Sequence, residues 1–295
     1  MTLDNHHICT HFGEKIQDAK RIVAIDTETA KNWRATEKFL PFCANFFSIL
    51  YPMPGGEMKF GLDNLYFESE TYFKSPTENT QSYLEKVDSI LSKYLSDGID
   101  TTFVGHQLSS DLCSLRNLST NHLQSVSNLI NGLQNRKKPG HSYPHVVDTR
   151  YDIKGRKLGE ERLRCVSLRM SIIAVQNELN EKSLTKLYNE YVVDNDQLKM
   201  EKLIIMNMRH SFQTALVWMI DSIYNNIPLF DNELNLPLIT TNKIIYKLFH
   251  GKIDYVDSEE YKETMKLTGI SQYIEKYQPN HSILKELVGY EKCHC

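Results

Sequence analysis

The feature that most constrains the fold is a short apolar run that ends in two closely spaced carboxylates. Residues 21–26 read RIVAID, and Glu28 follows two positions after Asp26. The β-branched run predicts a buried strand. Side chains two positions apart on a strand point to the same side, so Asp26 and Glu28 are predicted to converge. This pair is a candidate site for a hard divalent ion such as Mg²⁺, which prefers oxygen ligands.

A second strand-like run, residues 101–104, leads into Gly105, His106 and Gln107, and Asp111 follows four residues after Gln107. This order resembles the second motif of the DEDD 3′–5′ exonuclease superfamily, whose first motif is Asp-x-Glu after a strand. Gln107 stands where that family usually has Asn. The resemblance covers about residues 20–225, with weaker matches at residues 147–149 and 166–168. It implies a ribonuclease-H-like fold in which Asp26, Glu28 and Asp111 hold two divalent metal ions, Mg²⁺ or Mn²⁺.

The resemblance also implies an activity, the hydrolysis of phosphodiester bonds in single-stranded RNA or DNA to nucleoside monophosphates. Residues 136–169 contain ten Lys or Arg against four acids, which is +6 in a chain of net charge −3. A local basic wall of this kind is suited to guiding a phosphate backbone. A solvated charged loop fits the same pattern equally well. The residues expected to contact substrate are Thr27, His106, Gln107, Arg162 and Arg164.

The third motif of the family departs from its usual pattern. His210 stands where the fourth carboxylate is expected, and Met206 and Ile205 stand where the family has Tyr or His. If His210 is aligned with the family's histidine instead, the carboxylate position falls on Ala215. Asp221 lies about 16 Å further along the helix axis, too far to complete the site.

His210 therefore has three interpretations: a ligand that suits Mn²⁺ better than Mg²⁺, a catalytic base, or a histidine with only a packing or surface role. Asp26, Glu28, Asp111 and His210 form the candidate catalytic set. The alternative to an enzyme is a catalytically degenerate nuclease-fold protein that binds nucleic acid or protein. For Asp148, a strand-end cap is preferred to metal ligation.

The order of elements predicts an α/β fold, a ribonuclease-H-like mixed sheet flanked by helices, with a C-terminal helical appendage. The predicted division is an N-terminal extension over 1–19, the exonuclease domain over 20–227 and the appendage over 228–295. Further strands are expected at Phe42–Tyr51, Met58–Phe67 and His145–Thr149. Helices are expected at Tyr83–Leu95 with Gly98 just beyond the end, at Leu168–Leu179, Met208–Ile223, Asn242–His250 and Ser258–Tyr277.

Both ends of the chain carry residue types that bind zinc, at spacings that match no standard pair of ligand elements: His6, His7, Cys9 and His11, and Cys293, His294 and Cys295. A frayed terminus is the preferred interpretation of both.

The six cysteines are scattered, which favours reduced thiols in an intracellular compartment, cytoplasmic or nuclear. The sequence contains no apolar stretch of about 18 residues, so no membrane span is predicted. The N-terminus does not resemble a secretory signal.

Overall fold

The structure is a computed structural model of the 295-residue chain. It describes residues 6–31, 39–52, 65–153, 182–223 and 239–265, together with isolated residues between 162 and 179.

A six-stranded mixed sheet organises the fold, in the order β1-β4-β3-β2-β5-β6. Strands β2, β3 and β4 form an antiparallel meander, and β1 pairs antiparallel with β4. Strand β5 pairs parallel with β2, and β6 pairs parallel with β5. The strands are β1 (His7–Phe12), β2 (Ala19–Lys31), β3 (Phe39–Pro52), β4 (Tyr66–Phe73), β5 (Thr101–Gly105) and β6 (His145–Asp148).

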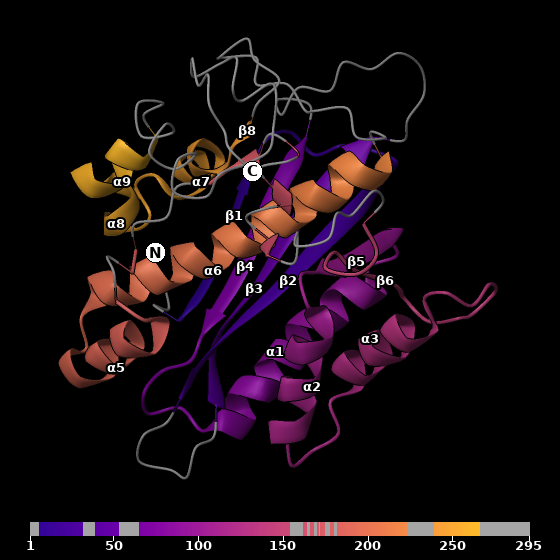
Figure 1. Cartoon of the computed structure of the whole chain (residues 1–295), viewed down its shortest axis with the longest axis horizontal. Helices are drawn as coiled ribbons and strands as arrows, with labels where there is room; N and C mark the ends of the chain where they lie inside the picture. The colour runs from indigo at the N-terminus through magenta and orange to yellow at the C-terminus, as the bar shows by residue number, and fades with distance from the viewer. Residues whose placement is uncertain are drawn as a thin grey trace, which may run out of the picture.

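Helices cover both faces of this sheet (Figure 1). One face carries α1 (Thr80–Ser96), α2 (Leu108–Leu118) and α3 (Gln124–Asn135). The other carries α5 (Leu184–Asp194) and the long helix α6 (Gln197–Trp218), which continues as the π-helical turn η2 (Met219–Ile223). The predicted α/β class, a mixed sheet flanked by helices, is thereby confirmed.

Strand β2 shows why the sequence forms this arrangement. Ile22 and Ala24 belong to the apolar core under α6, whereas Val23 and Ile25 belong to the core under α1–α3. All four are buried. A strand covered on both faces needs apolar side chains on both faces, so its sequence is a continuous apolar run rather than an alternating one.

The predicted end of the first helix is confirmed by the backbone. Helix α1 stops at Ser96, and Gly98 follows it with φ +80°, a left-handed conformation that glycine adopts without a Cβ penalty. Helix α6 with η2 contains the predicted Met208–Ile223 segment, and Asp196 caps its start by accepting from the Leu198 N–H at 2.9 Å.

One expectation about secondary structure is wrong. A helix over Leu168–Leu179 is interrupted by β7 (Ile172–Ile173), which pairs parallel with β8 (Ile239–Thr240). Short apolar runs rich in β-branched residues suit either state, and here the distant partner strand decides. Of the strand expected at Met58–Phe67, residues 58–64 lie outside the described part of the chain and stay a prediction, while Tyr66 and Phe67 open strand β4.

The N-terminal segment corrects the expectation of a frayed end. Strand β1 pairs with β4 over its whole length, from His7 opposite Tyr72 to Phe12 opposite Phe67. Ile8 and Thr10 point into the core, while Cys9 and His11 are exposed. The strand has only six residues, half of them polar, so its sequence pattern is too short to distinguish a strand from a disordered tail. Pairing with β4 is what fixes it in the sheet.

The C-terminal helices pack on the same core as the sheet. Helices α7 (Thr241–Phe249), α8 (Asp254–Asp257) and α9 (Glu259–Met265) follow β8. Ile245, Leu248 and Tyr255 are fully buried in the core that α6 shares with the strands. The helix expected at Asn242–His250 is confirmed, whereas residues 266–277 of the last predicted helix lie outside the described residues. The proposed division into 1–19, 20–227 and 228–295 stays a prediction.

Candidate functional site

The first carboxylate pair lies within β2 rather than at its end. The strand continues to Lys31, with Asp26 opposite Asn45 of β3 and a register shift just after Glu28. Pairing with β5 stops at Ala24, which lies opposite Val104, so the parallel neighbour ends before Asp26. The apolar run therefore ends where β2 loses one of its two neighbours, and the acids begin there.

Helix α6 brings two further polar side chains to this pair. His210 Nδ1 lies 3.2 Å from Glu28 Oε1 and 3.5 Å from Asp26 Oδ2. Asn207 Nδ2 donates to Asp26 Oδ2 at 2.6 Å. Asn207 and His210 are three residues apart, so one face of the helix presents both. Asp26, Glu28, Asn207 and His210 are called the β2–α6 site below.

Three of these side chains have the arrangement of a cation site. Ligand atoms of Asp26, Glu28 and His210 all lie within 4.8 Å of one another. Their side chains are 21%, 14% and 29% exposed, so they are partly shielded yet reachable from solvent. Two carboxylate oxygens and an imidazole nitrogen form a donor set suited to Mn²⁺ or a softer divalent ion better than to Mg²⁺.

The charges of the site alter the proton affinity of its members. Burial lowers the pKa of His210, but hydrogen bonds and attraction to Asp26 and Glu28 outweigh it and raise that pKa to about 10. Burial, together with the neighbouring charge of Asp26, raises the pKa of Glu28. The raised pKa favours the imidazolium form of His210 at neutral pH, and its single positive charge offsets part of the charge of the two carboxylates. In that state it is not available as a base.

Asn207 is a site residue that the sequence analysis missed. It is fully buried, and its Oδ1 accepts from the Cys43 thiol at 3.3 Å, which leaves its amide nitrogen pointing at Asp26. Burial and the two carboxylates raise the pKa of Cys43, so the thiol keeps its proton as a donor. Its spacing of three residues from His210 could have placed it on the same helix face. The third motif of the superfamily that the sequence resembles has no functional residue at this position, so the resemblance did not point to it.

Asp111 lies next to the β2–α6 site but does not join its ligand group. Thr27 Oγ1 donates to Asp111 Oδ1 at 2.8 Å. Thr27 alternates with Asp26 and Glu28 along β2, so its side chain points to the α2 face of the sheet. Burial first, and then the negative charge of Asp26 and Glu28, raise the pKa of Asp111 well above its usual range. The acids affect one another electrostatically, yet the group of converging ligands is completed by His210.

The loop between β5 and α2 is tied to the end of β6. Gln107 has φ +68° and turns the chain into α2. Asp148 Oδ1 accepts from the backbone N–H of Gln107 at 2.9 Å and of Arg150 at 3.1 Å. This confirms the expectation that Asp148 caps a strand end. His106 Nδ1 lies 3.1 Å from Thr149 Oγ1, so His106 and Gln107 both attach the β5–α2 loop to the end of β6.

The predicted basic wall is only partly visible. Arg136 forms an ion pair with Asp152 at 2.8 Å, and the Arg150 guanidinium donates to Gln107 Oε1. These two cations are engaged within the protein. Arg162 is exposed. Lys137 and Lys138 are exposed as well, and the other basic residues of this segment lie outside the described residues: Lys154, Arg156, Lys157, Arg164 and Arg169.

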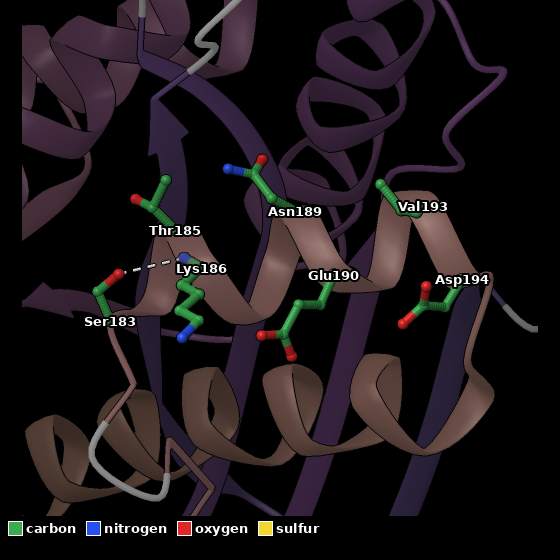
Figure 2. Close-up of a pocket in the computed structure, with 7 residues that line it drawn as sticks. All are labelled: Ser183, Thr185, Lys186, Asn189, Glu190, Val193 and Asp194. Atoms are coloured by element: carbon green, nitrogen blue, oxygen red, sulfur yellow. Dashed lines mark hydrogen bonds between the residues drawn. The ribbon is translucent and has the colours of Figure 1, made fainter.

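A hollow of about 550 Å³ lies along α5, away from this chemistry. Figure 2 shows side chains of one helix face around it, including Lys186, Asn189 and Glu190, with Ser183 Oγ accepting from the Lys186 N–H. Among the described residues that line it, none belongs to the β2–α6 site. The hollow is lined by one face of a single helix and the residue before it, and this lining aims no set of ligand atoms at a common point, unlike the β2–α6 site.

No protein-family model matches the chain, and the curated proteins contain no significant match to it. Among the described residues, no helix combines the length and the apolar character needed to cross a membrane.

Proposed function

We propose that this chain is a metal-dependent 3′–5′ exonuclease that hydrolyses the phosphodiester bonds of single-stranded RNA or DNA to nucleoside monophosphates. The observation that carries the proposal is the convergence of Asp26, Glu28 and His210, with ligand atoms within 4.8 Å of one another. Carboxylates crowded in a half-buried place repel one another, and a divalent cation relieves that repulsion. Perturbed acids gathered in this way are typical of functional sites.

A ribonuclease-H-like fold is part of the proposal. The order β4-β3-β2-β5-β6, with β2 central and first of these strands in the chain, supports it. So does the position of the two motifs, because Asp26 and Glu28 lie on the central strand and Asp111 lies in the first turn of the helix after β5.

The residues present fit a divalent ion. Asp26, Glu28 and His210 would hold it. Asp111, which accepts a hydrogen bond from Thr27 beside them, would contribute to a second ion. When bound, such ions activate water and stabilise the leaving oxygen of a phosphodiester. Two neighbouring side chains orient the carboxylates, because Asn207 donates to Asp26 and Thr27 donates to Asp111. Partners of this kind keep a ligand oxygen aimed at the site.

The proposal is tested with a 5′-labelled single strand, supplied as RNA and as DNA, in Mn²⁺ and in Mg²⁺. Wild-type protein is expected to shorten the strand from the 3′ end, faster in Mn²⁺, and Asp26→Asn is expected to abolish shortening. Glu85→Gln is the matched control, because it makes the same carboxylate-to-amide change on an exposed position of α1. Equal shortening by Asp26→Asn and wild type would overturn the proposal.

One observation favours a second candidate, a nuclease-fold protein that binds nucleic acid or protein without cleaving it. His210 stands where the resemblance expects the fourth carboxylate, and its imidazolium lies within 3.5 Å of both Asp26 and Glu28, where its single positive charge offsets part of theirs. A nucleic-acid binder of this kind would retain the labelled strand in every divalent metal and leave its length unchanged, and a protein binder would neither retain nor shorten it. The same assay therefore distinguishes the two candidates.

A further inference from the structure

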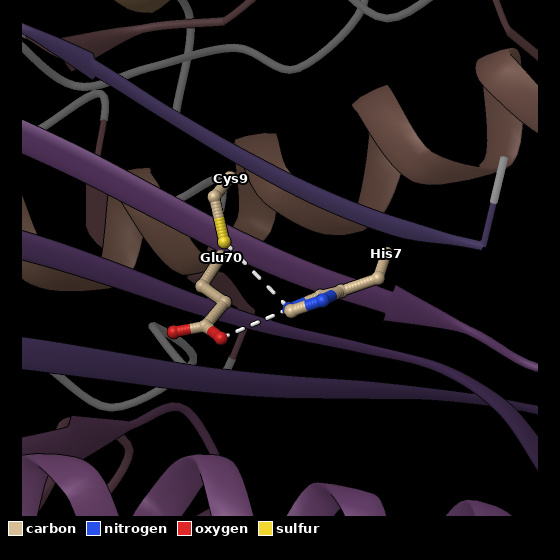
Figure 3. Close-up of side chains that lie close together, drawn as sticks. All are labelled: His7, Cys9 and Glu70. Carbon is tan, nitrogen blue, oxygen red and sulfur yellow. Dashed lines mark hydrogen bonds and ion pairs between the residues drawn. The ribbon is translucent and has the colours of Figure 1, made fainter. Parts of the chain in front are cut away.

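A second group of ligand-type side chains lies at the opposite edge of the sheet from β6. His7 and Cys9 of β1 and Glu70 of β4 have ligand atoms within 4.8 Å of one another. They are called the β1–β4 cluster here, and Figure 3 shows all three pointing toward one another. The two β1 residues are two apart and share a face, and Glu70 lies directly opposite Cys9 in the strand register.

We propose that the β1–β4 cluster binds a thiolate-preferring divalent ion of the zinc class, with three protein ligands and a fourth position open to solvent. Thiolate, imidazole and carboxylate are the ligand types that zinc takes in proteins. A three-ligand site with an open position is also a known zinc arrangement. The cluster thus differs in metal preference from the β2–α6 site, which has no sulfur ligand.

The distances within the cluster are close to those of a tetrahedral site. Bonds of about 2.3 Å to sulfur and about 2.0 Å to nitrogen at tetrahedral angles separate these two ligand atoms by about 3.5 Å. Cys9 Sγ lies 3.6 Å from His7 Nε2. The corresponding nitrogen–oxygen separation is about 3.3 Å, and His7 Nε2 lies 2.9 Å from Glu70 Oε1. A few tenths of an ångström of side-chain movement would accommodate the ion.

The surroundings hold two of the ligands in place and leave the third accessible. Glu70 is 1% exposed, and Lys93 Nζ lies 2.9 Å from each of its oxygens. The His7 ring packs edge-on against Tyr72 with centroids 5.9 Å apart. Cys9 is exposed, so an ion can enter from solvent at the sulfur.

Lys93 competes for the carboxylate but does not block it. Its side chain is 63% exposed and extends from α1, so it can move without disturbing the core. An ion that takes the Glu70 oxygen facing His7 leaves the other oxygen to Lys93. Lys93 then acts as an outer partner that orients the ligand, as is common at zinc sites.

The consequence of binding is a clamp on the edge strand. β1 is six residues long and pairs only with β4 among the described strands. An ion that bridges β1 and β4 binds the folded form and stabilises it in proportion to the logarithm of free ion over Kd. A hundredfold excess over Kd is expected to raise the unfolding midpoint by several degrees in a chain of this size.

Co²⁺ is the probe, added to the full chain in place of zinc. A tetrahedral thiolate site is expected to give a sulfur-to-cobalt charge-transfer band and visible ligand-field bands, and Zn²⁺ is expected to abolish both by displacement. Cys9→Ser should remove the charge-transfer band, and His7→Gln should weaken Co²⁺ binding at least about tenfold. Both side chains are on the open face of the edge strand, so these variants are expected to fold.

Two controls separate this site from its alternatives. Cys113→Ser removes a partly exposed thiol on α2 and should leave the bands unchanged. Asp26→Asn should also leave them unchanged, so failure of the proposed nuclease activity and failure of this site are independent results. A wild-type protein without the sulfur band, or a Cys9→Ser protein that retains it, would show that the cluster is only an ion pair fastening β1.

Discussion

Replacing Glu28 by Gln tests the electrostatics of the β2–α6 site directly. His210 lies 3.2 Å from Glu28 and 3.5 Å from Asp26, and the two carboxylates raise its pKa from 6.5 to about 10. That rise corresponds to about 5 kcal/mol of interaction with the protonated form. It is an upper figure, because Glu28 shares the same proton. Loss of one of the two carboxylates is expected to lower the pKa of His210 by about 1–3.

The pH dependence of stability follows from the same shift. A histidine whose pKa is raised on folding stabilises the protein fully below its unfolded pKa of about 6.5. That contribution is lost as pH rises from 6.5 through about 10. The free energy of unfolding of metal-free wild type should therefore fall across this range, and that of Glu28→Gln should fall less and at lower pH.

Histidine-selective NMR gives the measurement, with His210→Gln used to assign the resonance. In metal-free wild type the His210 ring signals should stay in the protonated position through pH 8. Addition of a diamagnetic divalent ion should release the proton, because a metal ligand must be deprotonated. An ordinary titration of His210 near pH 6.5 in the metal-free protein would refute the ion-pair geometry on which this reasoning depends.

Three other substitutions probe the supporting structure. Asn207→Ala removes the donor to Asp26 and should reduce nuclease activity or metal affinity about 10–100-fold, measured in the strand-shortening assay and by metal titration. Arg209→Met leaves Glu178 as an unpaired buried charge, since both side chains are fully buried, and should cost about 3–5 kcal/mol in urea unfolding. Adding Glu178→Leu should recover much of that loss, and no recovery would contradict the assignment. Gly132→Ala places a Cβ 2.5 Å from the carbonyl that precedes β6 and should cost about 1–3 kcal/mol, whereas an unchanged unfolding midpoint would mean that α3 can shift freely.

Local patterns predicted the elements that carry strong periodicity. The continuous apolar run of β2, the helical spacing of α1 and the Met208–Ile223 segment of α6 were all readable, because burial on a fixed face imposes a repeat on neighbouring residues. The same logic located the carboxylate pair on one side of β2. It did not show that β2 continues to Lys31, since that depends on pairing with β3.

Weak or interrupted patterns gave the errors. β1 has six residues and β7 has two, so neither contains enough of a repeat to separate a strand from a tail or a helix. Both are stabilised by partners far along the chain, β4 for one and β8 for the other. Of the β1–β4 cluster, the sequence showed His7 and Cys9 as zinc-type residues but not Glu70, which is 63 residues from His7 and is brought to them by strand pairing.

The sequence alone determined that Asp26 and Glu28 share a face, because alternation along a strand is a property of the backbone. Only the tertiary structure decided what faces them. The crossing of α6 over β2 brings Asn207 and His210 to the pair, while α2 approaches from the other face and carries Asp111 to Thr27. Helix packing is fixed by the whole core, and no local repeat encodes the side from which each helix arrives.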